Sequence, residues 1–112
     1  EEIRGANQTL IWSFDSRNNL VHKGIDESVA NAMNLMLRKA VESGTGQAAS
    51  ISGEIVGGKT GTSEGARDLW FIGSISELTS GIWMGFDDNR STEMSSGEAA
   101  NLWKVFMEDI LR

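Results

Sequence analysis

Two rhythms of apolar residues divide this chain into expected helices and expected strands. Apolar residues spaced three and four apart predict helices, whereas strand-forming residues in short runs predict strands. The first helical segment follows Asp26, a favourable N-cap residue, and ends at Ser43-Gly44. Its apolar positions are Val29, Ala32, Met33, Met36, Leu37, Ala40 and Val41. We expect this face to be buried, with the methionines filling the core.

The second helical segment begins at an S-x-x-E capping box made by Ser95 and Glu98. Its apolar positions are Ala99, Leu102, Trp103, Phe106 and Ile110. The pattern predicts a second amphipathic helix that runs to the end of the chain.

Short apolar runs predict the strands. Residues 9–14 (TLIWSF) are rich in strand formers and lead into the turn-forming residues 15–19 (DSRNN), so Leu20-Val21 is expected to pair back as a return strand. Residues 69–75 (LWFIGSI) and 82–86 (IWMGF) are apolar on both alternating faces, which is typical of strands covered on both sides. The link between them has hairpin length.

Composition narrows the class of protein. The 112 residues suffice for one modest domain, and 39% hydrophobic content with four tryptophans indicates a folded globule. A net charge of −6 argues against a general binder of nucleic acid or anionic membranes. The absence of cysteine removes disulfides and thiolate chemistry. No apolar run approaches the ~20 residues that span a bilayer. Because the chain starts at Glu1-Glu2, we expect a piece of a longer protein.

The glycine-rich residues 53–65 (GEIVGGKTGTSEG) match two motifs. From Gly53 onward they spell G-x-x-x-x-G-K-T, a phosphate-binding loop. Within the same letters, Lys59-Thr60-Gly61 is the K-T-G of penicillin-recognising acyl-transfer enzymes. A phosphate loop needs a buried strand before it and a helix after it. Here Ile55-Val56 occupies the loop, and no helical rhythm follows, so the sequence disfavours nucleotide binding.

The K-T-G motif belongs to an ordered set. The run ESGTGQAA…GGKTGTSEGARDLWFIGS…IWMGFDDN…SGEAANLWKVFMEDIL contains a G-T-G after a helix, K-T-G-T, D-x-W-F-x-G, W-x-G-x-D-D and a terminal helix. From about Ile11 onward, the chain resembles the C-terminal part of the transpeptidase domain of class A (bifunctional) penicillin-binding proteins. The resemblance implies an α+β fold, in which helices cover an antiparallel three-strand meander that carries K-T-G on its first strand.

Two elements of that family are missing. Its nucleophile lies in S-x-x-K, and no serine here is followed by lysine three residues later. Its S-x-N element has one literal match, Ser16-Arg17-Asn18, which we reject because it precedes the first helix in a turn. We therefore expect residues 1–112 to be an incomplete, C-terminal portion of a penicillin-binding transpeptidase domain.

The resemblance implies serine acyl transfer, in which an acyl-enzyme forms from a D-alanyl-D-alanine stem peptide and passes to an amine. Lys59 would supply positive charge to the substrate carboxylate and to the catalytic hydrogen bonds. The hydroxyls of Thr60 and Thr62 would bind that carboxylate, and Gly61 would keep the strand clear of side chains. The Thr62 N–H would form half of an oxyanion hole. The substrate would lie along this strand as an added strand.

The same resemblance implies the partners and the location. The partners are the peptidoglycan stem peptide, β-lactams and the missing N-terminal part of the domain, with no cofactor, no metal, no nucleic acid and no membrane segment in this chain. The location is extracytoplasmic, with a parent protein anchored to the cytoplasmic membrane. Because the strand at 82–86 would lack its neighbour, we expect the isolated chain to self-associate there or to pair that edge with residues 9–14.

Less specific interpretations stay open. The whole chain could be a non-catalytic module that binds a cell-wall peptide or a protein. Lys59 alone could be an edge charge that blocks aggregation. The segment Asp87-Asp88-Asn89 lacks the spacing of a calcium loop and is expected to be a solvated turn. His22 is expected at the surface. The tryptophans expected in the core are Trp70, Trp83 and Trp103.

Overall fold

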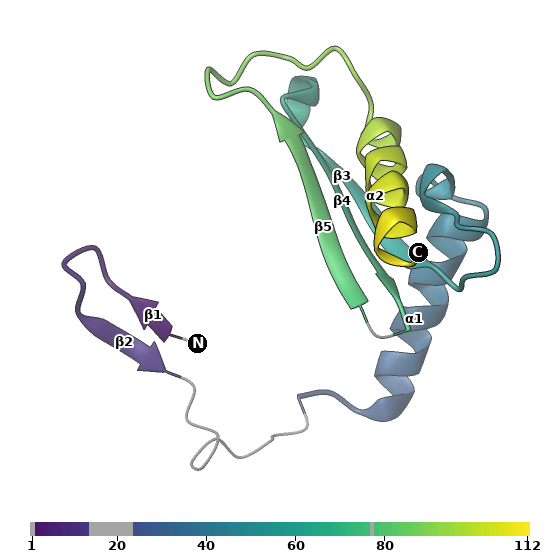
Figure 1. Ribbon diagram of the computed structural model, residues 1–112, viewed down its shortest axis with the longest axis horizontal. Coiled ribbons are helices and arrows are strands. Elements are labelled where there is room, and N and C mark those ends of the chain that lie inside the picture. The colour runs from purple at the N-terminus through teal and green to yellow at the C-terminus, as the bar shows by residue number, and fades with distance from the viewer. Residues whose placement is uncertain (1, 14–23, 77) are drawn as a thin grey trace.

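A computed structural model of the chain describes residues 2–13, 24–76 and 78–112 (Figure 1). Strands β1 (Glu2–Arg4) and β2 (Leu10–Ser13) form a hairpin ahead of helix α1 (Glu27–Glu42). The 3-10 turn η1 (Gln47–Ala49) leads to a second sheet, and helix α2 (Ser96–Ile110) ends the chain. The predicted α+β class is confirmed.

The second sheet is an antiparallel meander in the order β3-β4-β5. Its strands are β3 (Gly57–Thr62), β4 (Asp68–Ile75) and β5 (Leu78–Gly85), with the 3-10 turn η2 (Glu64–Ala66) between the first two. The prediction of three strands with Lys59-Thr60-Gly61 on the first is confirmed. The predicted link over residues 76–81 is too long, because residues 78–81 pair with the end of β4 and leave a two-residue connection.

The N-terminal hairpin differs from the prediction. Strand β2 pairs with β1. The sequence did not predict β1, because its residues Glu2 and Arg4 are charged and break the apolar pattern of a strand. The predicted return strand Leu20-Val21 lies outside the described residues, as do the rejected S-x-N triplet and His22. Strand β2 pairs with β1 in a separate sheet and not with β5, which is an edge of its own sheet, so the expected pairing of residues 9–14 with that edge is not formed within the described residues. Self-association through this edge stays a prediction.

Helix α1 has the predicted bounds but not the predicted burial. Its C-terminal part packs against β3 and η1, where Val41 is buried. Its N-terminal part extends beyond that contact, and Met33 and Met36 are 47% and 57% exposed. Val29 is likewise exposed. The expectation that the methionines fill the core is therefore wrong, because no described element covers that part of the helix.

Helix α2 begins at the predicted capping box and packs on the sheet through a different stripe. The buried residues of α2 are Ala99, Ala100, Trp103 and Met107. Leu102, Phe106 and Ile110 are about half exposed, so only part of the predicted apolar face of this helix is buried. The large Trp103 fixes the rotation of the helix, because its Nε1 donates a hydrogen bond to the Ser80 carbonyl at 3.1 Å.

The two faces of the meander are unequal. On the face under α2, Leu69 and Phe71 are fully buried. On the opposite face, Trp70 is 44%, Ile72 53% and Trp83 45% exposed. The expectation that both faces are covered is wrong for the described chain, and so is the expectation that Trp70 and Trp83 lie in the core. Trp103 alone of the three expected core tryptophans is buried.

The core is built around Phe71, whose ring occupies space that glycines leave open. A Cβ atom added to Gly58 would lie 2.4 Å from Phe71 Cζ. One added to Gly73 would lie 2.6 Å from Phe71 Cε1 and 2.8 Å from Trp103 Cζ2. Gly58 and Gly73 are partners across β3 and β4. The rings of Phe71 and Trp103 meet edge to face at a centroid distance of 5.2 Å.

Replacing Gly73 by alanine is expected to lower the free energy of unfolding by about 1–3 kcal/mol, because the added methyl group overpacks the two rings. Urea denaturation of the 112-residue chain would measure the change. The matched control is Gly24→Ala, where an added Cβ meets nothing within 4 Å. Equal stabilities of the two variants would contradict this account of the core.

The capping box of α2 predicts a pH dependence. Hydrogen bonds from the Ser95 hydroxyl and from backbone N–H groups hold the pKa of Glu98 below its ordinary value of 4.5. A folded pKa below the unfolded one stabilises the protein above the unfolded pKa, and this contribution disappears as the pH falls through the folded pKa. In Ser95→Ala, stability should fall less steeply as the pH drops below the ordinary carboxyl pKa of 4.5, because the pKa of Glu98 in the folded variant lies closer to its unfolded one. Parallel pH curves for wild type and Ser95→Ala, with Ser96→Ala as the control, would refute the link.

Candidate functional site

Lys59 lies on the exposed face of β3, at an edge of the sheet. Strand alternation places it opposite Ile72, on the face that α2 leaves uncovered. Its Nζ donates to the Thr60 carbonyl at 2.8 Å and lies 3.3 Å from Thr60 Oγ1. The ammonium is thus folded back against the next residue of its own strand, where it remains open to an approaching anion.

Thr60 points to the opposite face, and its side chain is nearly buried. Its Oγ1 lies 2.7 Å from the Oγ1 of Thr45, the middle residue of the G-T-G that follows α1. Two sequence motifs whose threonines are 15 positions apart therefore meet through their hydroxyl groups. Sequence reasoning gave Thr45 no role, and the one signal was a threonine between two glycines next to a helix end.

Gly61 and Thr62 complete the stretch. A Cβ added to Gly61 would lie 3.3 Å from Trp70 Cβ, so the glycine lets the indole stand close to the strand. Thr62 is exposed at the end of β3. Beyond it, Ser63 closes the turn to β4, because its Oγ accepts a hydrogen bond from the Asp68 N–H at 2.8 Å.

A row of aromatic side chains lies beside Gly61 on the open face. Trp70 and Trp83 are cross-strand partners whose ring centroids are 6.5 Å apart. Trp83 Nε1 donates to Asp68 Oδ1 at 3.0 Å, which fixes its indole. Trp70 and Trp83 therefore form an apolar surface next to Gly61, and the hydrogen bond to Asp68 fixes the orientation of Trp83.

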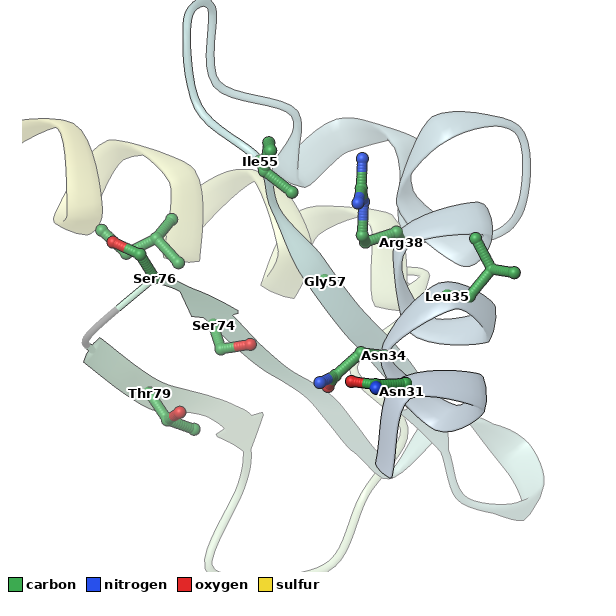
Figure 2. Close-up of a pocket in the computed structure, with 10 residues that line it drawn as sticks. Asn31, Asn34, Leu35, Arg38, Ile55, Gly57, Ser74, Ser76 and Thr79 are labelled. Carbon is green, nitrogen blue, oxygen red and sulfur yellow. The ribbon is translucent and has the colours of Figure 1, made fainter. Parts of the chain in front are cut away.

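An open groove of about 650 Å³ runs between α1 and the end of the sheet (Figure 2). Figure 2 shows Asn31 and Asn34 reaching from α1 toward the strands, with Ser74 and Thr79 on the sheet side. A smaller groove of about 260 Å³ shares Gly57, Ser74 and Thr79 with it and extends to Lys59. The open face is thus hollowed from the end of α1 as far as Lys59. The sequence did not predict this groove, because its lining comes from three separate segments.

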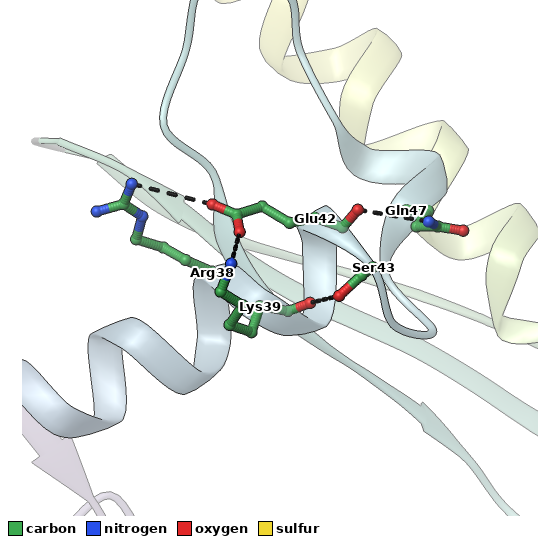
Figure 3. Close-up of polar contacts among 5 residues, drawn as sticks. All are labelled: Arg38, Lys39, Glu42, Ser43 and Gln47. Atoms are coloured by element: carbon green, nitrogen blue, oxygen red, sulfur yellow. Dashed lines mark hydrogen bonds and ion pairs between the residues drawn. The ribbon is translucent and has the colours of Figure 1, made fainter.

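Polar contacts at the end of α1 hold the loop that carries Thr45 (Figure 3). Glu42 pairs with Lys39 and lies 4.0 Å from Arg38, and the bond from Lys39 lowers the pKa of Glu42. Ser43 Oγ donates to the Lys39 carbonyl at 3.3 Å, and Gln47 Nε2 donates to the Glu42 carbonyl at 3.4 Å. The helix end and the turn after it are joined on both sides of Thr45.

These groups suit one class of ligand. An ammonium and hydroxyls bind a carboxylate through charge-assisted hydrogen bonds. The edge strand can accept an extended peptide as a further strand. Within the described ranges, no group of three His, Cys, Asp or Glu side chains could hold a metal ion. Asp87 and Asp88 lie in a turn, where the Arg90 N–H donates to Asp88 Oδ1 at 3.3 Å.

Comparison with known proteins identifies the family. The family model of the penicillin binding protein transpeptidase domain matches residues 9–107. Penicillin-binding protein 1A of Aquifex aeolicus is 38% identical over 80 residues, which are 69% of this chain and 11% of that protein. Penicillin-binding protein 4 of Bacillus subtilis is 39% identical over 77 residues, which are 63% of this chain and 12% of that protein.

A solved structure agrees with these matches. The D,D-transpeptidase domain of a peptidoglycan glycosyltransferase from Eggerthella lenta superimposes with a TM-score of 0.65 at 25% identity. The match covers 98% of this chain and 26% of that one. The chain spans about a tenth of the length of the curated relatives that it matches.

Proposed function

Because the chain belongs to the family of penicillin-binding protein transpeptidase domains, we propose that it is the C-terminal portion of such a domain and supplies the substrate-binding strand for peptidoglycan cross-linking. The observation that carries the proposal is the placement of Lys59, Thr60, Gly61 and Thr62 on β3, at an edge of the sheet. The exposed Lys59 ammonium and Thr62 hydroxyl, with the nearly buried Thr60 hydroxyl beside the ammonium, support binding of the carboxylate that a D-alanyl-D-alanine stem peptide or a β-lactam carries.

The proposed reaction is serine acyl transfer. A serine supplied by the rest of the domain attacks the penultimate D-alanyl carbonyl, the terminal D-alanine leaves, and an amine of a second stem peptide takes up the acyl group. Lys59 holds the substrate carboxylate, and Thr60 and Thr62 add hydroxyl donors. The backbone N–H of Thr62 serves as one oxyanion donor, an interaction worth ~2.7–4 kcal/mol in the transition state.

The uncovered face of the sheet supports the proposal that this chain is only a portion of a transpeptidase domain. Trp70, Ile72 and Trp83 expose apolar surface beside the groove, and exposed contiguous apolar surface marks a contact with another element. We assign that contact to the remainder of the transpeptidase domain, outside the cytoplasm. No helix in the described ranges is long and apolar enough to cross a membrane.

The 112-residue chain by itself is expected to form no covalent adduct with penicillin, because it contains no S-x-x-K serine. Intact-mass measurement after incubation with a reactive β-lactam tests this. One penicilloyl group per chain on any serine would show that the nucleophile lies within this sequence, contrary to the proposal.

In a complete transpeptidase domain that contains this chain, Lys59→Ala is expected to lower the second-order rate of β-lactam acylation by about ten- to a hundredfold, since a hydrogen bond to a charged group contributes roughly 1.5–3 kcal/mol. Lys59→Arg should restore only part of the rate, because the planar guanidinium of arginine replaces the compact ammonium of lysine. Stopped-flow or mass-resolved acylation kinetics provide the measurement.

Lys104→Ala is the matched control for that experiment. It removes the same charge from an exposed pair with Glu108 on α2 and should leave acylation unchanged. If Lys59→Ala also acylates at the wild-type rate but becomes less soluble, Lys59 is an edge charge that blocks aggregation. A domain that binds stem peptide without ever being acylated would instead indicate the non-catalytic module.

A further inference from the structure

We propose that Thr45 is a positioning residue for the candidate site: its hydroxyl orients the hydroxyl of Thr60 and, through it, the ammonium of Lys59. The inference rests on the proposed function, because its main readout is acylation of the complete domain. The observation behind it is the 2.7 Å contact between Thr45 Oγ1 and Thr60 Oγ1.

Packing forces Thr45 into this position. The Gly46 N–H donates to the Ala40 carbonyl at 2.9 Å and closes the end of α1. A Cβ added to Gly46 would lie 3.2 Å from both the Ala40 carbonyl oxygen and Phe71 Cε2. One added to Gly44 would lie 2.9 Å from the Ala40 oxygen. Two glycines therefore let the loop press against the helix end and the core, and the residue between them faces β3.

The number of hydrogen bonds that the Thr60 hydroxyl can accept and donate then determines the direction of its own hydrogen. Lys59 carries only donors, so Thr60 Oγ1 accepts in their 3.3 Å contact. A hydroxyl accepts two hydrogen bonds and donates one. The 2.7 Å contact allows either hydroxyl to donate, and in the proposed arrangement Thr45 is the donor. Both acceptor positions of Thr60 are then filled, and its own hydrogen is the one left for an anion. Thr45 thus converts Thr60 from a hydroxyl that could accept or donate into a fixed donor beside the ammonium.

Burial makes this arrangement hold. Thr60 is 9% exposed, so water has little access to replace Thr45 as the partner of its hydroxyl. A buried polar group that loses its partner pays the cost of desolvation, and the least costly response is to rotate away. Removal of the Thr45 hydroxyl should therefore change the direction of the Thr60 hydroxyl rather than leave it in place.

The test measures second-order β-lactam acylation of the complete domain. Thr45→Val, which removes the hydroxyl and retains the shape, should lower the rate by roughly three- to tenfold, the effect of one neutral hydrogen bond. Thr45→Ser should restore it. If Thr45 acts through Thr60, then Thr45→Val should cause no further loss in a Thr60→Val background.

The matched control is Thr92→Val. The Thr92 hydroxyl is also partly buried, but it donates to the Ala66 carbonyl at 2.6 Å and accepts from the Met94 N–H at 3.3 Å, and neither partner belongs to β3. This variant should lose thermal stability without losing acylation rate. An undiminished rate in Thr45→Val, or an equal loss in the Thr60→Val background, would overturn the inference.

The outcome separates the two proposals. If wild type is acylated and Lys59→Ala is impaired, the proposed function stands whatever Thr45 does. If Lys59→Ala acylates normally, the site assignment fails before Thr45 is considered. Melting temperatures measured for every variant show whether a rate loss reflects unfolding, and a Thr45→Val loss that follows melting temperature and is not rescued by serine counts against positioning.

Discussion

The contact of Phe71 with three glycines is the constraint on which the rest of the chain depends. Its ring occupies the space that Cβ atoms on Gly58 and Gly73 would need and lies 3.2 Å from where a Cβ on Gly46 would be, and the edge-to-face contact with Trp103 completes the packing. These residues come from the loop after α1, from β3, from β4 and from α2. One aromatic side chain thus joins four segments that are distant in sequence, and each glycine is required by space rather than by an unusual backbone angle.

The same contact positions the candidate site. Gly58 precedes Lys59, so any outward shift of β3 to relieve the ring would displace the ammonium. Gly46 follows Thr45, so the loop bearing the second hydroxyl is held by the same ring. Core and candidate site are therefore coupled through adjacent residues: one of each pair packs against Phe71, and the other contributes a side chain to the candidate site.

Sequence patterns predicted the elements because local spacing specifies them. The period of α1 and α2, the capping box and the strand runs all depend on neighbours within a few residues. Burial was predicted less well, because it depends on which element arrives opposite. The Met33 and Met36 side chains match an apolar face that no described element covers, and Trp103 alone explains why α2 turns Leu102 outward. The contact of Thr45 with Thr60 could not be predicted either, since it requires the loop, the ring and the strand together.

The exposed apolar face and the absent S-x-x-K serine fit one arrangement, in which this chain supplies the substrate-binding strand and another part of the domain supplies the nucleophile. A strand that binds a peptide through its edge needs a rigid backbone. In this chain, the packing of Phe71 against the glycines holds the backbone of β3 in place. Lys59 lies on the side of the sheet where Trp70, Ile72 and Trp83 leave apolar surface, and a groove lined in part by Ile72 reaches it. A helix or strand that packed on this apolar surface would bury it and would also bring its own side chains close to Lys59. The proposed site would then be completed by the same contact that completes the fold, so that binding geometry and domain stability arise together.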